Sequence, residues 1–232
     1  MNDKISEFTY KIETKPDYAF LNVKIPSGKT IKVEASAMAS MDSNIVMKTK
    51  FSGGLKRFIS GESLFINEFT AESGEGEINI APGPPGDLEH TYLDGNTIYL
   101  QGSAFVASGM GIVTDTKWQG FKRGFFSGNS FFLIKCTGKG DLWFNAYGGI
   151  IELDIDGDYV VDTGYIVAFT EGLSYDVKSV GGYKSLFFSG EGLVCRFEGK
   201  GKVWIQTKQI SPFASFLYMY RPVEKKSSSS ID

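Results

Sequence analysis

Apolar and polar residues alternate with a period of two along most of the chain, which predicts β-strands with one buried and one exposed face. The alternation is clearest in four segments, at residues 30–34, 97–101, 141–145 and 202–206. Short strands separated by glycine-containing turns extend over nearly the whole sequence. The pattern therefore predicts an all-β protein.

Turn and helix signals interrupt this pattern at few places. Asp94-Gly95 and Asp156-Gly157 lie between alternating runs and are typical of type I′ hairpin turns. Ser211 is a suitable N-cap and Pro212 fits the first position of a helix, so we expect one short helix over 211–220. Residues 223–232 are rich in serine and lysine, and we expect a disordered tail there.

Three sequence markers each occur three times, in the same order and about 61–67 residues apart. The first marker is a turn and strand start at 28–31, 95–98 and 157–160. The second is a Gly-x-Lys segment at 54–61, 120–128 and 182–190. The third is a Gly-x-Gly turn and strand at 74–80, 138–144 and 199–205.

These markers predict three β units, covering about 8–82, 83–147 and 148–210, within one domain over 1–222. A unit this small is marginally stable alone, so we expect the three to share a core in a pseudo-threefold arrangement that leaves few open strand edges. The Gly-x-Gly turns have a local cause, because a tight connection needs a positive φ that glycine adopts without a Cβ clash.

Composition argues against an enzyme. The 232 residues include one His and two Cys, which leaves little material for a His- or Cys-built metal site or a nucleophilic centre. Asp154–Asp158 only partly matches a calcium loop, and we interpret it as a hairpin turn. We interpret His90 as a surface-loop residue. We expect no cofactor, no metal and no catalytic residues.

A repeated pair of basic and aromatic residues is the most suggestive feature. Cations beside apolar side chains suit a membrane surface, although the same pattern also fits the solvated flank of a core strand. The candidate contact residues are Lys56, Arg57, Lys122, Arg123, Phe125, Phe126, Lys184 and Phe187.

Nucleic-acid binding is disfavoured because 24 Lys and Arg against 27 Asp and Glu give a net charge of −3. We therefore expect Trp118, Trp143 and Trp204 to pack in the core rather than stack on bases. No apolar run of about 18 residues and no signal peptide or mitochondrial presequence is visible, which favours a cytoplasmic protein. Cys136 and Cys195 are expected as reduced, partly buried thiols.

Several motifs together resemble the altered-inheritance-of-mitochondria (mitochondrial biogenesis) family, whose prokaryotic members were long described as a domain of unknown function. The motifs lie at residues 16–23, 53–57, 60–65, 81–87, 146–148, 161–164 and 189–197. The resemblance covers about 8–218. It implies a β-sandwich of the tryptophan RNA-binding attenuator type, related to the double-stranded β-helix. It also implies homo-oligomers, with a trimer as the first expectation, and no established catalytic residues.

The sequence thus predicts a non-enzymatic, self-associating scaffold or binding module whose partners are itself and a membrane surface or another protein. The alternative is a small-molecule sensor with a pocket between β units. RNA binding is a third and weaker hypothesis.

Overall fold

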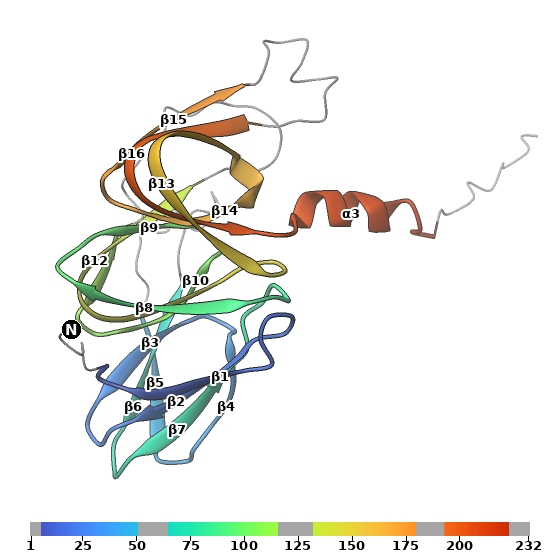
Figure 1. Ribbon diagram of the computed structural model, residues 1–232. Helices are drawn as coiled ribbons and strands as arrows, with labels where there is room; N and C mark the ends of the chain where they lie inside the picture. Colours follow the sequence, from blue (N-terminus) through green and yellow to red (C-terminus); the bar gives the residue numbers. More distant parts are fainter. Residues whose placement is uncertain (1–5, 51–64, 116–131, 180–192, 223–232) are drawn as a thin grey trace, which may run out of the picture.

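The computed structural model describes residues 6–50, 65–115, 132–179 and 193–222. Figure 1 shows a stack of β-layers that follows the chain from its N-terminal part at one end to its C-terminal part at the other, with a single helix projecting from the side. The prediction of an all-β protein is confirmed.

The strands fall into three consecutive groups. The first group contains β1 Thr9–Glu13, β2 Phe20–Ile25, β3 Thr30–Glu34, β4 Met38–Met41, β5 Ile45–Lys50, β6 Ile66–Ala71 and β7 Gly76–Ile80. The second contains β8 Leu88–Asp94, β9 Ile98–Gln101, β10 Phe105–Gly109, β11 Ile112–Asp115 and β12 Leu133–Asn145. The third contains β13 Ile150–Asp162, the 3-10 turn η1 Thr163–Tyr165, β14 Ile166–Thr170, β15 Leu173–Ser179 and β16 Leu193–Gln206.

The same pairing scheme occurs in each group, which we call the first, second and third unit. In the first unit, β7 pairs with β2 and β4, and β6 pairs with β3 and β5. In the second unit, the single strand β12 replaces β6 and β7, and pairs with β8, β9, β10 and β11. In the third unit, β16 does the same with β13, β14 and β15. The threefold repeat in the sequence is therefore a threefold repeat of strand pairing.

Glycines with positive φ lie at the repeated turn positions. Gly138 and Gly199 have φ values of 111° and 122°, and they lie inside β12 and β16, where one strand passes from its first set of partners to its second. A side chain at Gly138 would place its Cβ 2.2 Å from the carbonyl oxygen of Gly111. Glycine is required there by both the backbone angle and the close approach.

The two predicted hairpin turns are wrong in their geometry. Strands β8 and β9 flank Asp94-Gly95, yet both pair with β12 and not with each other. Gly157 has φ 112° but lies within the continuous strand β13. The positive φ indicated by the Asp-Gly sequence is present, but it does not reverse the chain, because a long strand, β12 or β16, pairs with the residues on both sides of the glycine.

Two ladders join the units. Strand β3 pairs with β10, and β9 pairs with β14. Within the described residues no ladder joins the third unit to the first, whereas a closed pseudo-threefold axis would require one. The units therefore stand in an open row, with the second unit in the middle (Figure 1).

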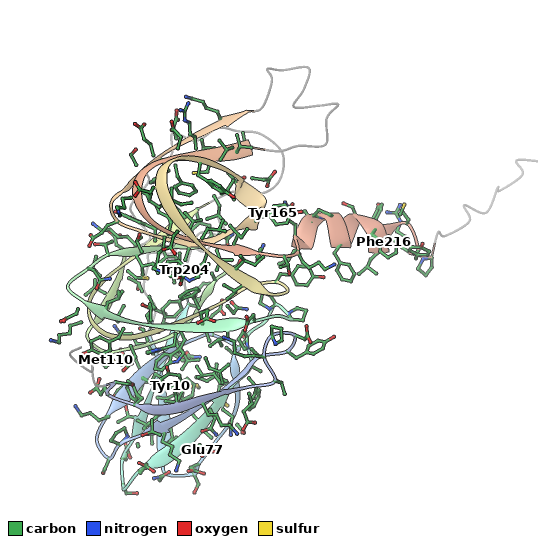
Figure 2. All side chains as sticks on the ribbon, viewed as in Figure 1. Tyr10, Glu77, Met110, Tyr165, Trp204 and Phe216 are labelled. Atoms are coloured by element: carbon green, nitrogen blue, oxygen red, sulfur yellow. The ribbon has the colours of Figure 1, made fainter. Side chains whose placement is uncertain are left out.

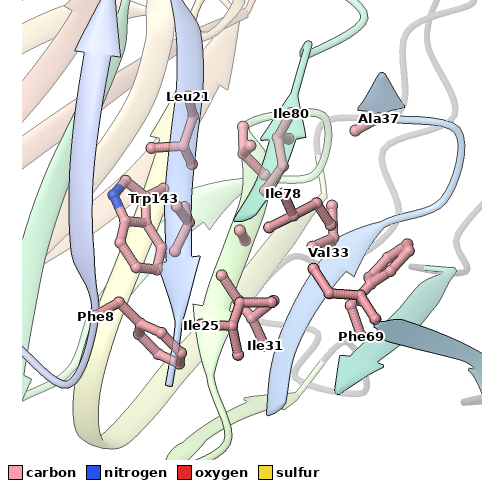
Figure 3. Close-up of a cluster of buried hydrophobic side chains, with 14 of the residues drawn as sticks. Phe8, Leu21, Ile25, Ile31, Val33, Ala37, Phe69, Ile78, Ile80 and Trp143 are labelled. Atoms are coloured by element: carbon pink, nitrogen blue, oxygen red, sulfur yellow. The ribbon is translucent and has the colours of Figure 1, made fainter. Parts of the chain in front are cut away.

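Each unit surrounds its own apolar core, and neighbouring units contribute to it. Figure 3 shows the first core, where Leu21, Ile31 and Ile78 from three strands of the first unit pack near Trp143 of the second unit. Trp204 of the third unit packs in the second core in the same way, and its ring lies 5.7 Å from that of Phe144. The prediction of core positions for Trp143 and Trp204 is confirmed, and Trp118 lies outside the described residues.

Helix α3, Ile210–Tyr218, follows β16, close to the expected helix over 211–220. The expected tail at 223–232 lies outside the described residues.

We expect alanine substitutions to separate the two demands on the repeated glycines. In Gly157→Ala only the positive φ is unfavourable, because nothing lies within 4 Å of the added Cβ. This substitution should lower the free energy of unfolding by roughly 1–3 kcal/mol. In Gly138→Ala the added Cβ also clashes with the carbonyl oxygen of Gly111, so the loss of unfolding free energy should be larger. Thermal or urea unfolding measures both, with Gly83→Ala, which has neither constraint, as the neutral control. Equal losses for Gly138→Ala and Gly157→Ala would contradict the role of the close approach.

Candidate interaction surface

The eight residues predicted from the basic-aromatic repeat belong to segments outside the described part of the chain. Lys56 and Arg57, Lys122 to Phe126, and Lys184 and Phe187 lie outside the described residues. They stay a prediction from sequence.

Helix α3 forms an apolar surface that sequence analysis did not single out. None of its residues is buried, although most of them are large and apolar. Phe216 and Leu217 are each 50% exposed and Tyr220, just after the helix, is 71% exposed. Ordinary monomers rarely leave so many neighbouring apolar side chains in water.

The helical spacing places the largest of these side chains together. Phe213, Phe216, Leu217 and Tyr220 follow the i, i+3, i+4, i+7 pattern that defines one face of a helix. Ser211 and Ser215 belong to the opposite face. We call Phe213, Phe216, Leu217 and Tyr220 the α3 face. The apolar composition of residues 211–220 is visible in the sequence, but only the structure shows that the strands do not cover these side chains.

The helix contacts the β-body near its beginning. The rings of Phe213 and Tyr147 lie 6.0 Å apart, while Phe216 contacts Tyr220, whose ring is 5.1 Å away. The Arg221 guanidinium lies 3.4 Å from the centre of the Tyr218 ring. Figure 2 shows Phe216 on the part of the helix that stands away from the strands. The α3 face is thus held at its base and open beyond it.

The helix carries no acidic residue in its first turn and no basic residue in its last turn. Arg221 follows it, and the sequence continues through Glu224 to Lys225 and Lys226. Basic residues therefore outnumber acidic ones at this end of a chain whose overall net charge is −3.

A second cluster of polar and aromatic groups lies between the first and second units. The Nε2 atom of His90 lies 2.8 Å from Oδ1 of the fully buried Asp141, and the backbone N–H of Glu7 donates to Oδ2 of the same carboxylate at 3.0 Å. The rings of Tyr10 and Trp143 lie 4.5 and 5.1 Å from the His90 ring. The interpretation of His90 as a surface-loop residue is wrong, because the residue lies in β8 and is mostly buried.

This cluster holds the first unit against the second. Asp141 accepts hydrogen bonds from the N-terminal segment and, through His90, from β8, so its carboxylate is satisfied by partners within the protein. Burial, together with the nearby Asp141 and Glu89 carboxylates, raises the pKa of Tyr10. These contacts hold the first and second units together, and the ring of Trp143 separates the polar groups from the first apolar core.

The cysteines and carboxylates form no recognisable metal centre in the part of the chain that the structure describes. Cys136 and Cys195 are buried and unpaired, and burial raises the pKa of each thiol to about 12. Asp154 to Asp158 lie along the continuous strand β13 and not in the hairpin turn that the sequence predicted. Among the described helices none is long and apolar enough to cross a membrane.

Comparison with known proteins agrees with this architecture. The family model described as mitochondrial biogenesis AIM24 matches residues 10–208. An uncharacterised protein of Streptococcus pyogenes serotype M6 is 26% identical over 235 residues, covering 96% of this chain and 94% of the relative. The crystal structure of another Streptococcus pyogenes protein superposes with a TM-score of 0.78 at 24% identity, covering 92% of this chain and all of the other.

The repeated strand pairing places the chain in a class of all-β proteins built from three similar units. The chain belongs to the mitochondrial biogenesis family named above, as the resemblance implied. The specific function of its relatives is uncharacterised, so the function of this chain has to be argued from its own surfaces.

One carboxyl group provides a test of burial in the first unit. Glu34 closes strand β3, and burial raises the pKa of its carboxyl from 4.5 to about 7. The folded protein therefore keeps this proton over a pH range in which the unfolded chain has lost it.

We expect the stability contributed by Glu34 to be fully present below pH 4.5 and to fall as the pH rises toward 7. The side chain is partly solvated, so the loss should be about 1–2 kcal/mol. Urea unfolding at a series of pH values should show that Glu34→Gln removes this decline, while Glu72→Gln, at an exposed turn, leaves it in place. An unchanged decline in Glu34→Gln would contradict the assignment.

Proposed function

We propose that this protein is a non-enzymatic binding module that attaches to the surface of anionic membranes through helix α3. The observation that carries the proposal is the α3 face, which is apolar, preformed and, beyond the contact of Phe213 with Tyr147, not covered by the rest of the described chain. A fold that buries its strands in three cores and leaves one helix of this composition exposed has a contact to make elsewhere.

A membrane interface suits the chemistry of this helix. Phenylalanine and leucine can enter the acyl boundary while tyrosine hydroxyls remain among the headgroups. The helix is nine residues long, too short to span a bilayer but long enough to lie in its surface. Ser211 and Ser215, on the opposite face, would face water.

Charge supports an anionic surface over a neutral one. Arg221 stands at the end of the helix, and Lys225 and Lys226 follow in the sequence. Each basic residue near an anionic leaflet contributes about 1 kcal/mol. The basic-aromatic segments around Lys56, Lys122 and Lys184 have the same composition, and several weak contacts on one chain would add by avidity.

Co-sedimentation with vesicles tests the proposal. The protein should pellet with phosphatidylserine–phosphatidylcholine vesicles, less with phosphatidylcholine alone, and less again at high salt. Phe216→Ser/Leu217→Ser/Tyr220→Ser removes most of the α3 face, and burying each such side chain contributes roughly 1.5–3 kcal/mol, so partition should drop at least tenfold.

The matched control is Met47→Ser/Val113→Ser, which removes exposed apolar side chains from β5 and β11 without touching α3. It should pellet like the unmodified protein. Lys56→Glu/Lys122→Glu/Lys184→Glu reports separately on the basic-aromatic segments. A protein that stays in the supernatant with both vesicle types, or an α3 variant that pellets unchanged, would contradict membrane attachment through α3.

A further inference from the structure

The row of units ends in two strand edges of different kind. At one end, β4 pairs with β7, and the described residues offer no partner on its other side. At the other end, residues 158–162 of β13 pair with β16 and likewise have no second partner in the described chain. Open strand edges are templates for pairing with another chain.

Each of these edges has two counterparts that are paired inside the chain. Strands β4, β10 and β14 occupy the same place in the three units, and all three ladders show the same irregularity, between Met38 and Ser40, between Phe105 and Ala107, and between Ile166 and Ala168. Similarly, residues 158–162 occupy the place of β3 and β9. The internal ladders join one kind of edge to the other, β3 to β10 and β9 to β14.

Exposure follows the same division. All five residues of β10 are buried, as are four of the five residues of β14, whereas β4 has three exposed residues among its four. Near the other end, Tyr159 and Val160 are 44% and 56% exposed, whereas their counterparts in β9, Ile98 and Tyr99, are buried and half-buried; Val161, like its counterpart Leu100, is buried. The two end edges are thus more exposed than their counterparts that are paired inside the chain.

We infer that a second copy of this chain continues the row, with β4 of one molecule pairing antiparallel to residues 158–162 of the next. The register follows from the internal ladders. Leu100 and Val161 each lie opposite the residue four positions before the repeated glycine of β12 or β16, so they are equivalent. Since Phe169 lies opposite Tyr99, its counterpart Met41 should lie opposite Val160.

The contact between molecules should be weaker than the contacts inside the chain. Trp143 and Trp204 each pack into the core of the preceding unit. In the first unit the equivalent residue is Asn79 and not a tryptophan. Asn79 accepts a hydrogen bond from Asn22 at 2.9 Å and donates to Ser40 at 3.0 Å. The ladder can form without a tryptophan anchor, so association should be reversible and depend on concentration.

The two joined edges differ, which makes the interface heterologous. Such a contact closes into a ring if the rotation between molecules allows it, and otherwise continues as a filament. A symmetric dimer that paired residues 158–162 with themselves would leave β4 open and would use a contact found nowhere inside the chain.

Disulfide trapping in the full chain tests this arrangement. Opposed residues of an antiparallel pair have Cα separations that a disulfide can bridge. Chains carrying Met41→Cys and chains carrying Val160→Cys should form a covalent dimer under mild oxidation when mixed, and neither should do so alone. The native thiols are buried. Met47→Cys mixed with Val160→Cys is the matched control, because Met47 is exposed on a different edge.

Cross-linking of Val160→Cys with itself, or equal yields in the Met41 and Met47 mixtures, would overturn the proposal. A second measurement uses sedimentation velocity. Met41→Lys with Val160→Lys should remove the concentration-dependent increase in mass, and Met41→Lys with Val160→Glu should restore it, with melting temperature confirming that all variants fold. Mass that instead disappears in the α3 variant and persists in the double-lysine variant would assign self-association to the helix and overturn pairing of the edges.

Discussion

The structure depends on a backbone constraint at two glycines. At Gly138 and Gly199 a strand must adopt a positive φ and pass against a neighbouring carbonyl oxygen, at Gly111 and Gly172 respectively. Only glycine meets both demands without strain. Because the strand continues beyond the bend, β12 and β16 each serve two sets of partners, and one segment closes both sides of a core. In the first unit the same position, Gly74, separates two strands instead.

Joining of the units follows from a second constraint, the need to cover strand edges. The tryptophans of the second and third units fill the core of the unit before them, and the ladders β3·β10 and β9·β14 bring the backbones together. The buried Asp141, held by His90 and by the backbone of Glu7, adds a polar connection at the first of these joints. The row is cohesive because each joint combines the apolar burial of a tryptophan with a backbone hydrogen-bond ladder.

Much of this fold could be predicted from the sequence. Alternation revealed the strands, and repetition of the glycine markers revealed three units, because both patterns are local and periodic. The sequence could not show that Asp94-Gly95 bends a chain between sheets instead of reversing it, since that choice depends on a long partner strand elsewhere. His90 was misplaced for the same reason: its partner Asp141 lies 51 residues away. The α3 face was missed because apolar residues usually predict burial, and only the arrangement of the strands shows that nothing covers them.

The interior and the exposed surfaces carry different information about function. The cores explain why the chain folds as a row; among the described residues their thiols are buried and unpaired, and the Asp141 carboxylate is hydrogen-bonded inside the protein. Helix α3 and the two ends of the row are features of the described chain that packing within it does not explain. A row whose two ends expose different strand edges can be extended by a second copy of the chain, while the helix at its side is suited to a different partner. The two contacts use separate residues, so a chain held at a surface through α3 could still pair with its neighbours, and attachment at a surface would raise the local concentration that such weak pairing requires.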